Sequence, residues 1–291
     1  MKALAEFIMR GRSQAMLVAA LGTFSLLFAW LGAAAVALVI MRLGMNAGVT
    51  VLLAAIVPGA FWTMLNGEIG PLSTVLCVAM IALVLRWTRD WSSVMVALPM
   101  VIGCWCMSLL LFAPELFAGW LAQLQQVTDQ LFARMNEQRE AAGQEVIADM
   151  PQQTVEQLLG VFALMQLLSS VLSLMVARWM QALLYNPGGF REEIHGLRLN
   201  KWHVVLLVLG LVLLSNNETY RIWSWLFALP ICIAGLALVH GVFRLRNISG
   251  QWLLLFYIAL FFLAPLTPLL MMLAIADSAL DFRGRLRSAA P

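Results

Sequence analysis

Two clusters of polar residues stand at the ends of long apolar runs, where they would be suited to binding a small molecule. Each cluster has a tryptophan beside it, and aromatic walls with a few polar groups are the usual make-up of a ligand pocket. Glu68 and Arg221 would pair, or orient a polar solute between the tryptophans. The alternative is that all are loop residues beside an ordinary aromatic belt at the membrane surface. The predicted ligand-binding residues are Trp62, Asn66, Glu68, Asn216, Asn217, Glu218, Arg221 and Trp223.

Residues for catalysis or metal binding are scarce. Glu192 and His195 have the spacing of half a di-iron carboxylate site, but the sequence holds neither a second copy nor the further carboxylates that such a site needs. All four cysteines lie inside apolar runs, without a second cysteine or a histidine at zinc-ligand spacing. Nucleophile-elbow, zinc-protease and phosphate-loop motifs are missing from the sequence. We therefore expect no enzyme activity, no metal and no cofactor.

The composition indicates which solvent surrounds these residues. Of the 291 residues, 62% are hydrophobic and 11% are charged, whereas ordinary soluble chains are roughly 25% charged. So few charges cannot cover so much apolar surface, and the chain is therefore predicted to lie in a lipid bilayer. The net charge of +3 gives no reason to expect a nucleic-acid partner.

Apolar runs long enough to cross a bilayer identify the elements that position these residues. A crossing helix needs about 20 residues. A shorter run, 203–214, crosses only if it is extended at its ends. The predicted fold is all-α: one integral membrane domain over residues 1–291, built as a transmembrane helix bundle with about eight membrane segments. The long runs are 14–41, 47–65, 69–86, 94–113, 157–184, 222–243 and 251–276.

Basic residues predict the orientation, because cytoplasmic loops are rich in lysine and arginine. If 14–41 is broken into two short helices, about 14–28 and 30–41, twelve basic residues fall on one side and three on the other. We therefore predict a broken first segment whose turn is shielded by protein, a cytoplasmic N-terminus, and a place in the cell membrane (the inner one in a Gram-negative cell). A cleaved signal peptide over residues 1–35 is the alternative, although the apolar run continues beyond it.

The last run, 251–276, leaves two alternatives open. A single crossing would place Arg283, Arg285 and Arg287 outside, whereas two short passes, broken at Pro265 and Pro268, would place them in the cytoplasm. We favour the broken form because it puts the three arginines on the cytoplasmic side.

One polar segment, 114–156, interrupts the apolar runs. Its apolar residues recur at helical spacing, and seven acids against two arginines leave it with a net charge of −5. We predict an amphipathic helical insertion on the outer face, with a helix of about six turns. This helix would lie over the bundle, or act as a lid over a ligand site.

The most distinctive motif is Asn-Pro-Gly-Gly at 186–189, a compact turn in which proline fixes φ and a glycine takes positive φ. Phe190, Ile194 and Leu197 follow on one helical face, which predicts a cytoplasmic turn and a short interfacial helix over residues 185–200. This segment, the elbow, is either a structural connector or a docking element for a partner. The predicted docking residues are Asn186, Pro187, Gly188, Gly189, Phe190, Arg191 and Glu192.

The run N-P-G-G-F-R-E-E at 186–193, the polytopic layout and the insertion before the fifth long run together resemble the YybS-like membrane proteins. The resemblance implies no settled activity, but a fold similar to that of S components, the substrate-binding subunits of energy-coupling-factor vitamin transporters. S components use a row of alanines to meet their membrane coupling protein. Ala29, Ala33 and Ala37 form a comparable row, which would serve partner docking or packing within the chain.

Two functions follow as expectations. The first is a transport-associated membrane protein that captures a small solute at the outer face and is energised by a separate ATPase. The second is a non-transporting membrane scaffold or assembly partner, which uses the insertion and the elbow as contact surfaces. A small molecule bound to the purified protein would favour the first, and a stable membrane partner without a ligand would favour the second.

Overall fold

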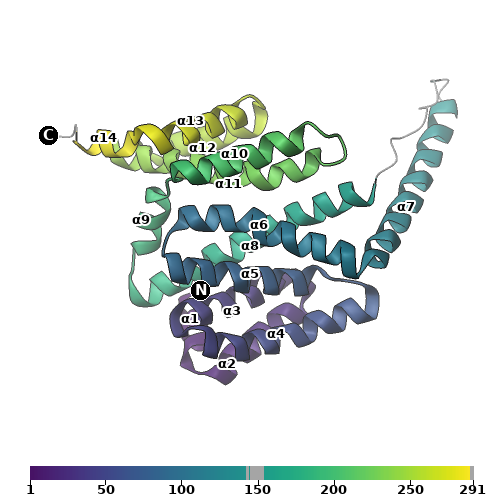
Figure 1. Cartoon of the computed structure of the whole chain (residues 1–291), viewed down its shortest axis with the longest axis horizontal. Coiled ribbons are helices and arrows are strands. Elements are labelled where there is room, and N and C mark those ends of the chain that lie inside the picture. Colours follow the sequence, from purple (N-terminus) through teal and green to yellow (C-terminus); the bar gives the residue numbers. More distant parts are fainter. Residues whose placement is uncertain (142–143, 145–153, 289–291) are drawn as a thin grey trace.

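The computed structural model describes residues 1–141, 144 and 154–288, except for the side chains of the last two. Every element in these ranges is helical, and most helices run antiparallel to their chain neighbours (Figure 1). The predicted all-α fold is confirmed. The helices are α1 (Lys2–Arg10), α2 (Arg12–Phe24), α3 (Ala29–Leu43), α4 (Met45–Asn66), α5 (Gly70–Thr88), α6 (Trp91–Phe112), α7 (Pro114–Ala141), α8 (Val155–Tyr185), α9 (Gly189–Gly196), α10 (Lys201–Ser215), α11 (Arg221–Leu245), α12 (Gly250–Phe262), α13 (Leu266–Leu280) and α14 (Phe282–Ser288).

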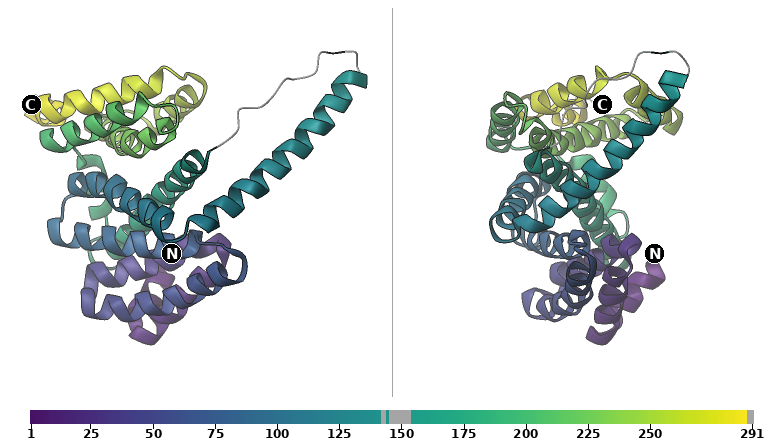
Figure 2. Two further views of the ribbon diagram at one scale, coloured as in Figure 1. Left: turned by 45° about the vertical axis from the view of Figure 1, so that its right-hand side comes forward. Right: turned by 90° about the vertical axis from the view of Figure 1, so that its right-hand side faces the viewer.

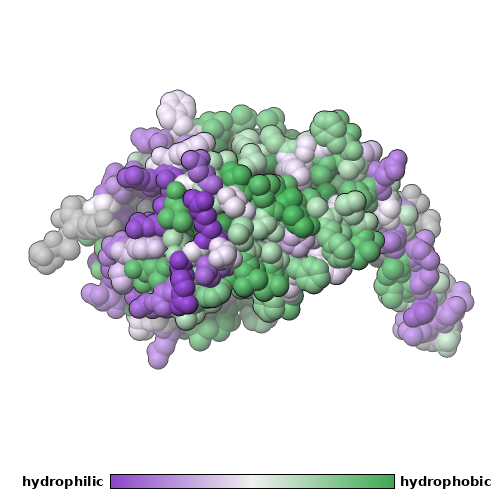
Figure 3. All heavy atoms as spheres, turned by 90° about the horizontal axis from the view of Figure 1, so that it is seen from below, coloured by the Kyte–Doolittle hydropathy of each residue, from purple (hydrophilic) through white to green (hydrophobic). Residues whose placement is uncertain are grey.

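Within the described ranges, six helical stretches are long and apolar enough to cross a bilayer. The number rises to eight if each of two bent helix pairs, α9–α10 and α12–α13, is counted as one span. Figure 3 shows a broad apolar surface that separates a polar end of the molecule from the polar helix α7. The chain is therefore an integral, multi-pass membrane protein. We call the two ends the elbow end, which holds residues 185–200, and the α7 end, which holds the loops at 67–69 and 216–220.

The first apolar run is broken, as predicted. α2 ends at Phe24, and a short 3-10 turn over Leu26–Phe28 leads into α3. The two helices pack closely, since a Cβ on Gly22 would lie 2.6 Å from the backbone nitrogen of Gly32. The expectation that protein shields the turn is wrong for its side chains, because Leu27 is 75% exposed. The indole of Trp62 instead donates a hydrogen bond of 2.7 Å to the Phe24 carbonyl beside the turn.

The predicted alanine row lies on α3, the helix that α2, α4, α5 and α8 surround. Ala29 is 7% exposed, and Ala33 and Ala37 are fully buried. Small side chains let neighbouring helices approach closely when there is no hydrophobic force to drive them together in lipid. The row therefore packs within the chain and offers no open surface to a partner.

The last apolar run is also broken. The chain bends by 119° between α12 and α13, with Leu263 to Pro265 between the two helices. Because α13 returns toward the elbow end, α14 lies there (Figure 1). This arrangement is the two-pass form that we favoured. It places Arg283 and Arg285 at the elbow end, while the Arg287 side chain lies outside the described part of the chain.

The polar insertion begins with α7, a helix of 28 residues. An aromatic cluster holds the first turns of α7, which we call its root. The ring centroid of Phe117 lies 5.2 Å from that of Trp120 and 5.7 Å from that of Phe162 in α8. Past this root, α7 runs away from the bundle (Figure 2). The predicted helix is confirmed for 114–141. The expectation that the helix lies over the bundle is wrong beyond its root, since Leu131 is 54% exposed. Residues 142–153, apart from Gln144, lie outside the described residues.

Candidate functional site

The polar residues predicted to bind a ligand all lie at the α7 end, but they do not form one cluster. The six that are not tryptophans are exposed: Asn66, Glu68, Asn216, Asn217, Glu218 and Arg221. Arg221 pairs with Glu218, three residues away, at 3.6 Å. Glu68 has no ion pair with any described residue under the 4 Å limit for such pairs. The predicted Glu68–Arg221 pair is therefore wrong.

The two tryptophans of the predicted site serve as packing anchors in separate places. The Trp62 indole donates to the Phe24 carbonyl. Trp223, 7% exposed, donates a 2.8 Å bond to the Glu156 carbonyl in the first turn of α8. Its ring packs so tightly on Gly160 that a Cβ there would lie 2.9 Å from it. A buried indole N–H requires an acceptor, which the Glu156 carbonyl supplies to Trp223, and the half-buried Trp62 also uses a backbone carbonyl of a neighbouring helix.

The elbow folds as its sequence predicts. Gly188 has a φ of +92°, and Gly189 fits against Asn186, whose Nδ2 would lie 2.1 Å from an added Cβ. The helix α9 then turns Phe190 inward, with its ring 6.5 Å from that of Trp91. Arg191 and Glu192 are exposed. The two glycines therefore differ in role, since one supplies a left-handed backbone and the other supplies space.

Glu193, next to the predicted docking residues, ties three elements together. Arg178 of α8 forms an ion pair with this carboxylate and donates its Nε–H to Oε2 at 2.8 Å. The Trp91 indole of α6 donates to the same oxygen at 3.2 Å. Glu193 therefore joins α9 to both α6 and α8.

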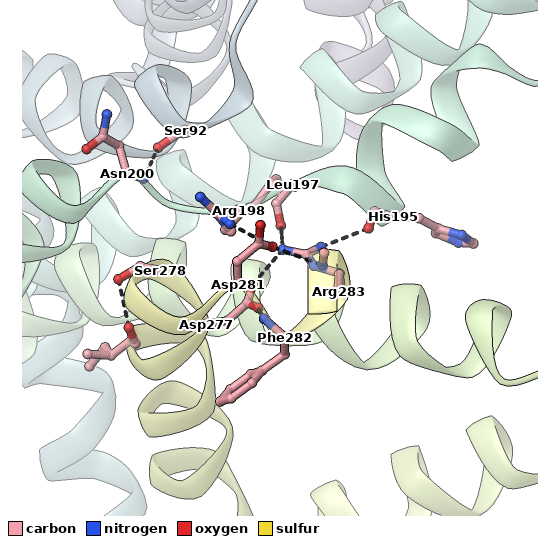
Figure 4. Close-up of polar contacts among 12 residues, drawn as sticks. Ser92, His195, Leu197, Arg198, Asn200, Asp277, Ser278, Asp281, Phe282 and Arg283 are labelled. Carbon is pink, nitrogen blue, oxygen red and sulfur yellow. Dashed lines mark hydrogen bonds and ion pairs between the residues drawn. The ribbon is translucent and has the colours of Figure 1, made fainter. Parts of the chain in front are cut away.

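A second network fastens the C-terminal helices to the elbow (Figure 4). Arg283 of α14 pairs with Asp277 of α13 at 2.8 Å, and their side chains are 6% and 2% exposed. The same guanidinium donates to the carbonyls of His195 and Leu197 at 2.8 and 2.7 Å. The second Asp277 oxygen accepts the Phe282 N–H at 2.9 Å. A buried pair with this many hydrogen bonds is satisfied, and removing either member would leave a buried charge.

The described histidines also lie at the elbow end. Nδ1 of His203 lies 2.7 Å from the Ser92 hydroxyl, and Ser92 accepts the Asn200 N–H at 2.8 Å. His240 contacts the Tyr257 hydroxyl at 2.8 Å, and the His195 and His240 rings are 5.9 Å apart. In the described ranges, no three His, Cys, Asp or Glu side chains are grouped to hold a metal ion.

A cavity of about 800 Å³ opens beside the Arg178–Glu193 pair. Three helices, α3, α5 and α8, end around it. Arg86 at the end of α5 reaches across and donates to the carbonyls of Ile40 and Met41 at 3.1 and 2.7 Å. The walls of the cavity carry four arginines and one glutamate, so the cavity has an excess of positive charge. The lining residues are Met41, Arg42, Leu85, Arg86, Trp87, Arg89, Arg178, Gln181 and Glu193.

Sequence reasoning missed these elbow-end networks, although it held one signal for them. Arg178 stands inside the apolar run 157–184, and Asp277 directly follows the run 251–276. An ionised side chain within such a run is costly unless it finds a partner. A search for the partner of each charge would have directed attention to the elbow end. The partners themselves, Glu193 and Arg283, follow only from the fold.

Comparison with family models, with curated proteins and with solved structures found no match to this chain.

Proposed function

We propose that this integral membrane protein is an assembly partner, a scaffold that binds another protein through α7. One observation carries the proposal: α7 leaves the bundle after its root and exposes an apolar stripe along the rest of its length. Leu124, Val127 and Leu131 are 40%, 54% and 54% exposed, and Met135 is 45% exposed. A helix outside the apolar belt gains stability when such a stripe is covered.

The spacing of the stripe favours a helical partner. From Phe117, positions 121, 124, 128, 131 and 135 follow at alternating intervals of four and three residues, and all are apolar except Thr128. An average interval of 3.5 residues is the pattern by which one helix packs along another in a coiled coil. The root residue Phe117 is already covered by the bundle, so the free stripe begins at Leu121.

Charge favours a protein partner over lipid and over a second copy. Helices that adsorb to membranes are usually rich in lysine and arginine, whereas α7 carries four acids and two arginines. In a parallel pair of two copies, Arg134 of one helix would flank the seam opposite Arg139 of the other, and like charges at these positions disfavour pairing. A partner helix with acidic residues beside its apolar seam would complement both arginines.

A photocrosslinking residue placed in the stripe tests the proposal in the intact membrane. With the crosslinker at Leu131, we expect one product whose mass adds a second polypeptide. With the crosslinker at Gln126, which lies off the stripe, we expect none. The double variant Leu124→Glu/Leu131→Glu should abolish the complex, whereas Gln126→Glu/Gln130→Glu should not. Crosslinking to lipid, crosslinking to a second copy, or no difference between the two positions would each overturn the proposal.

The second candidate is a transport-associated protein that binds a small solute, as the resemblance to YybS-like proteins and S components implies. The arginine-lined cavity favours it, although that cavity lies at the opposite end from the predicted outer-face site. Native mass spectrometry of the gently extracted protein distinguishes the candidates. A small molecule retained without a partner polypeptide supports solute binding, and a retained polypeptide without a small molecule supports the scaffold.

A further inference from the structure

The cavity at the elbow end holds more positive charge than its own residues neutralise. Four arginines line it, namely Arg42, Arg86, Arg89 and Arg178, and Glu193 is the only carboxylate among the lining residues. Glu193 is already paired with Arg178. The other three guanidinium groups therefore face the cavity without an ion pair to any carboxylate of the described residues.

The hydrogen bonds of these three arginines leave most of their donors free. Arg86 uses a single nitrogen, Nη1, for the two carbonyls that end α3. Arg42 stacks on Tyr185, with its guanidinium carbon 3.9 Å from the ring centroid, and makes no side-chain hydrogen bond to a described residue. Arg89 likewise has no hydrogen-bond or ion-pair partner in the described ranges. Since each guanidinium carries five N–H donors, the cavity can surround a multivalent acceptor.

The cavity also lies at a particular depth. It opens where three apolar helices end, at residues 43, 88 and 185. Trp87 on its wall is 75% exposed, and Tyr185 under Arg42 is 45% exposed. Tryptophan and tyrosine gather at the level of lipid headgroups, so this is the level at which phosphate groups of the bilayer lie.

An arginine in the last turn of a helix is often explained by the helix dipole. That explanation suits Arg42 and Arg86, in the last turns of α3 and α5, and Arg89 at the C-cap of α5. It accounts neither for Arg178, two turns before the end of α8, nor for the convergence of the four arginines on one cavity. Planar guanidinium groups bind phosphate oxygens in pairs, with short and charge-assisted hydrogen bonds. We propose that this cavity binds a phosphate group through Arg42, Arg86 and Arg89. Arg178 lines the remaining side of the cavity, and its ion pair with Glu193 keeps it from binding the phosphate. The proposal does not depend on the role of α7.

The test uses the full chain, purified in detergent, with two probes: inorganic phosphate and short-chain phosphatidylglycerol. Arg42→Gln/Arg89→Gln removes two exposed arginines and leaves the hydrogen bonds of the fold intact. For whichever probe binds the native chain, we expect this double variant to weaken binding about tenfold or more, given the usual strength of charge-assisted hydrogen bonds. Arg244→Gln/Arg246→Gln removes the same charge from the elbow end outside the cavity, and we expect a change of less than about twofold.

Glu193→Gln supplies a test of opposite sign. It neutralises the carboxylate that occupies Arg178, so we expect tighter phosphate binding, while loss of the pair lowers the melting temperature. Binding of both probes would identify a phosphate site that is open to lipid and to solution. Binding of phosphatidylglycerol alone would identify a lipid headgroup as the source, and binding of phosphate alone a soluble source. Binding of neither probe to the native chain, or equal losses in the two double variants, would overturn the proposal.

Discussion

The two ends of this bundle use their polar residues in opposite ways. At the α7 end, the exposed polar side chains of the loop at 216–221 bond within their own turn: Asn216 donates to the Val212 carbonyl at 3.0 Å, and Glu218 pairs with Arg221. At the elbow end, the bonds join distant parts of the chain, such as Trp91 to Glu193 and Arg86 to Met41. Exposed polar residues in loops are satisfied locally or by water, whereas a charge that is withdrawn from water, such as Arg178 or Arg283, is satisfied by other helices.

This contrast teaches where a binding site is to be sought in a membrane bundle. A cluster of polar residues beside a tryptophan, as at 62–68, has the composition of a ligand pocket but lies in an exposed turn. A single charge inside an apolar run, as at Arg178, looks isolated but marks a junction of elements. A charge near lipid must find a partner, so a single charge inside an apolar run is the more informative of the two signals.

The largest effect concerns which end faces the cytoplasm, because accessibility is all or none. We predict that the elbow end is cytoplasmic and the α7 end is outside. In intact cells, a membrane-impermeant maleimide should label Gln126→Cys and should fail to label Glu192→Cys until the membrane is opened. Both side chains are exposed, and the unsubstituted chain gives the background from its native cysteines. The reverse labelling pattern would invert the whole orientation.

The buried pair at the elbow end should give the largest loss of stability. Asp277→Ala leaves the Arg283 guanidinium buried without its carboxylate, and we expect a loss of about 3–5 kcal/mol in unfolding free energy. Arg283→Met added to that variant should restore part of the loss, because the uncompensated charge is gone.

The neighbouring pair Arg198–Asp281 provides the matched control for this effect. Its side chains are 39% and 52% exposed at a distance of 2.7 Å. Arg198→Ala should cost less than about 1 kcal/mol, since exposed pairs contribute little, and it leaves the hydrogen bond from the Gly284 N–H to Asp281 in place. Equal losses for Asp277→Ala and Arg198→Ala, measured by denaturant unfolding in mixed micelles, would show that burial does not distinguish the two pairs.

The turn of the elbow should give an intermediate effect. Gly188→Ala forces a side chain into the left-handed region at a φ of +92°, and we expect it to lower stability by about 1–2 kcal/mol. Gly196 also has open space around its Cβ position but no positive φ. Because alanine is the better helix former there, Gly196→Ala should be neutral or slightly stabilising. Thermal unfolding of both variants in detergent measures the difference, and equal shifts would contradict a conformational cause.

The smallest effect is predicted for the α7 end. Glu68→Gln and Arg221→Gln should each change stability by less than about 0.5 kcal/mol, and their effects should add, because the residues share no partner. A double-mutant cycle read by thermal unfolding measures the coupling. A coupling energy above about 1 kcal/mol would mean that the two charges do meet, and the contrast between the two ends would then fail.

Much of the fold was predictable, because lipid constrains a helix strongly. Run length and apolarity located the crossing helices, the distribution of arginines indicated the break in 14–41, and Asn-Pro-Gly-Gly predicted a positive φ at one of its two glycines. Each of these depends on residues close together in the sequence. The site was less predictable, because Glu193 meets Arg178 and Trp91 only through packing of α6, α8 and α9. Likewise, no local pattern indicates that Trp223 lies against Gly160, which is why it was assigned to a pocket.

The clasp formed by Arg283 has a consequence for how the protein is made. A ribosome releases the His195 and Leu197 carbonyls long before it reaches their donor, which lies 88 and 86 residues further along the chain. Until then, α9 is held to α6 and α8 through Glu193, while these two carbonyls wait for their donor. A chain truncated before residue 283 would therefore keep the Glu193 contacts of the elbow and lose only its attachment to α13 and α14. The elbow is thus fastened in two steps, first to helices made before it and then to helices made after it.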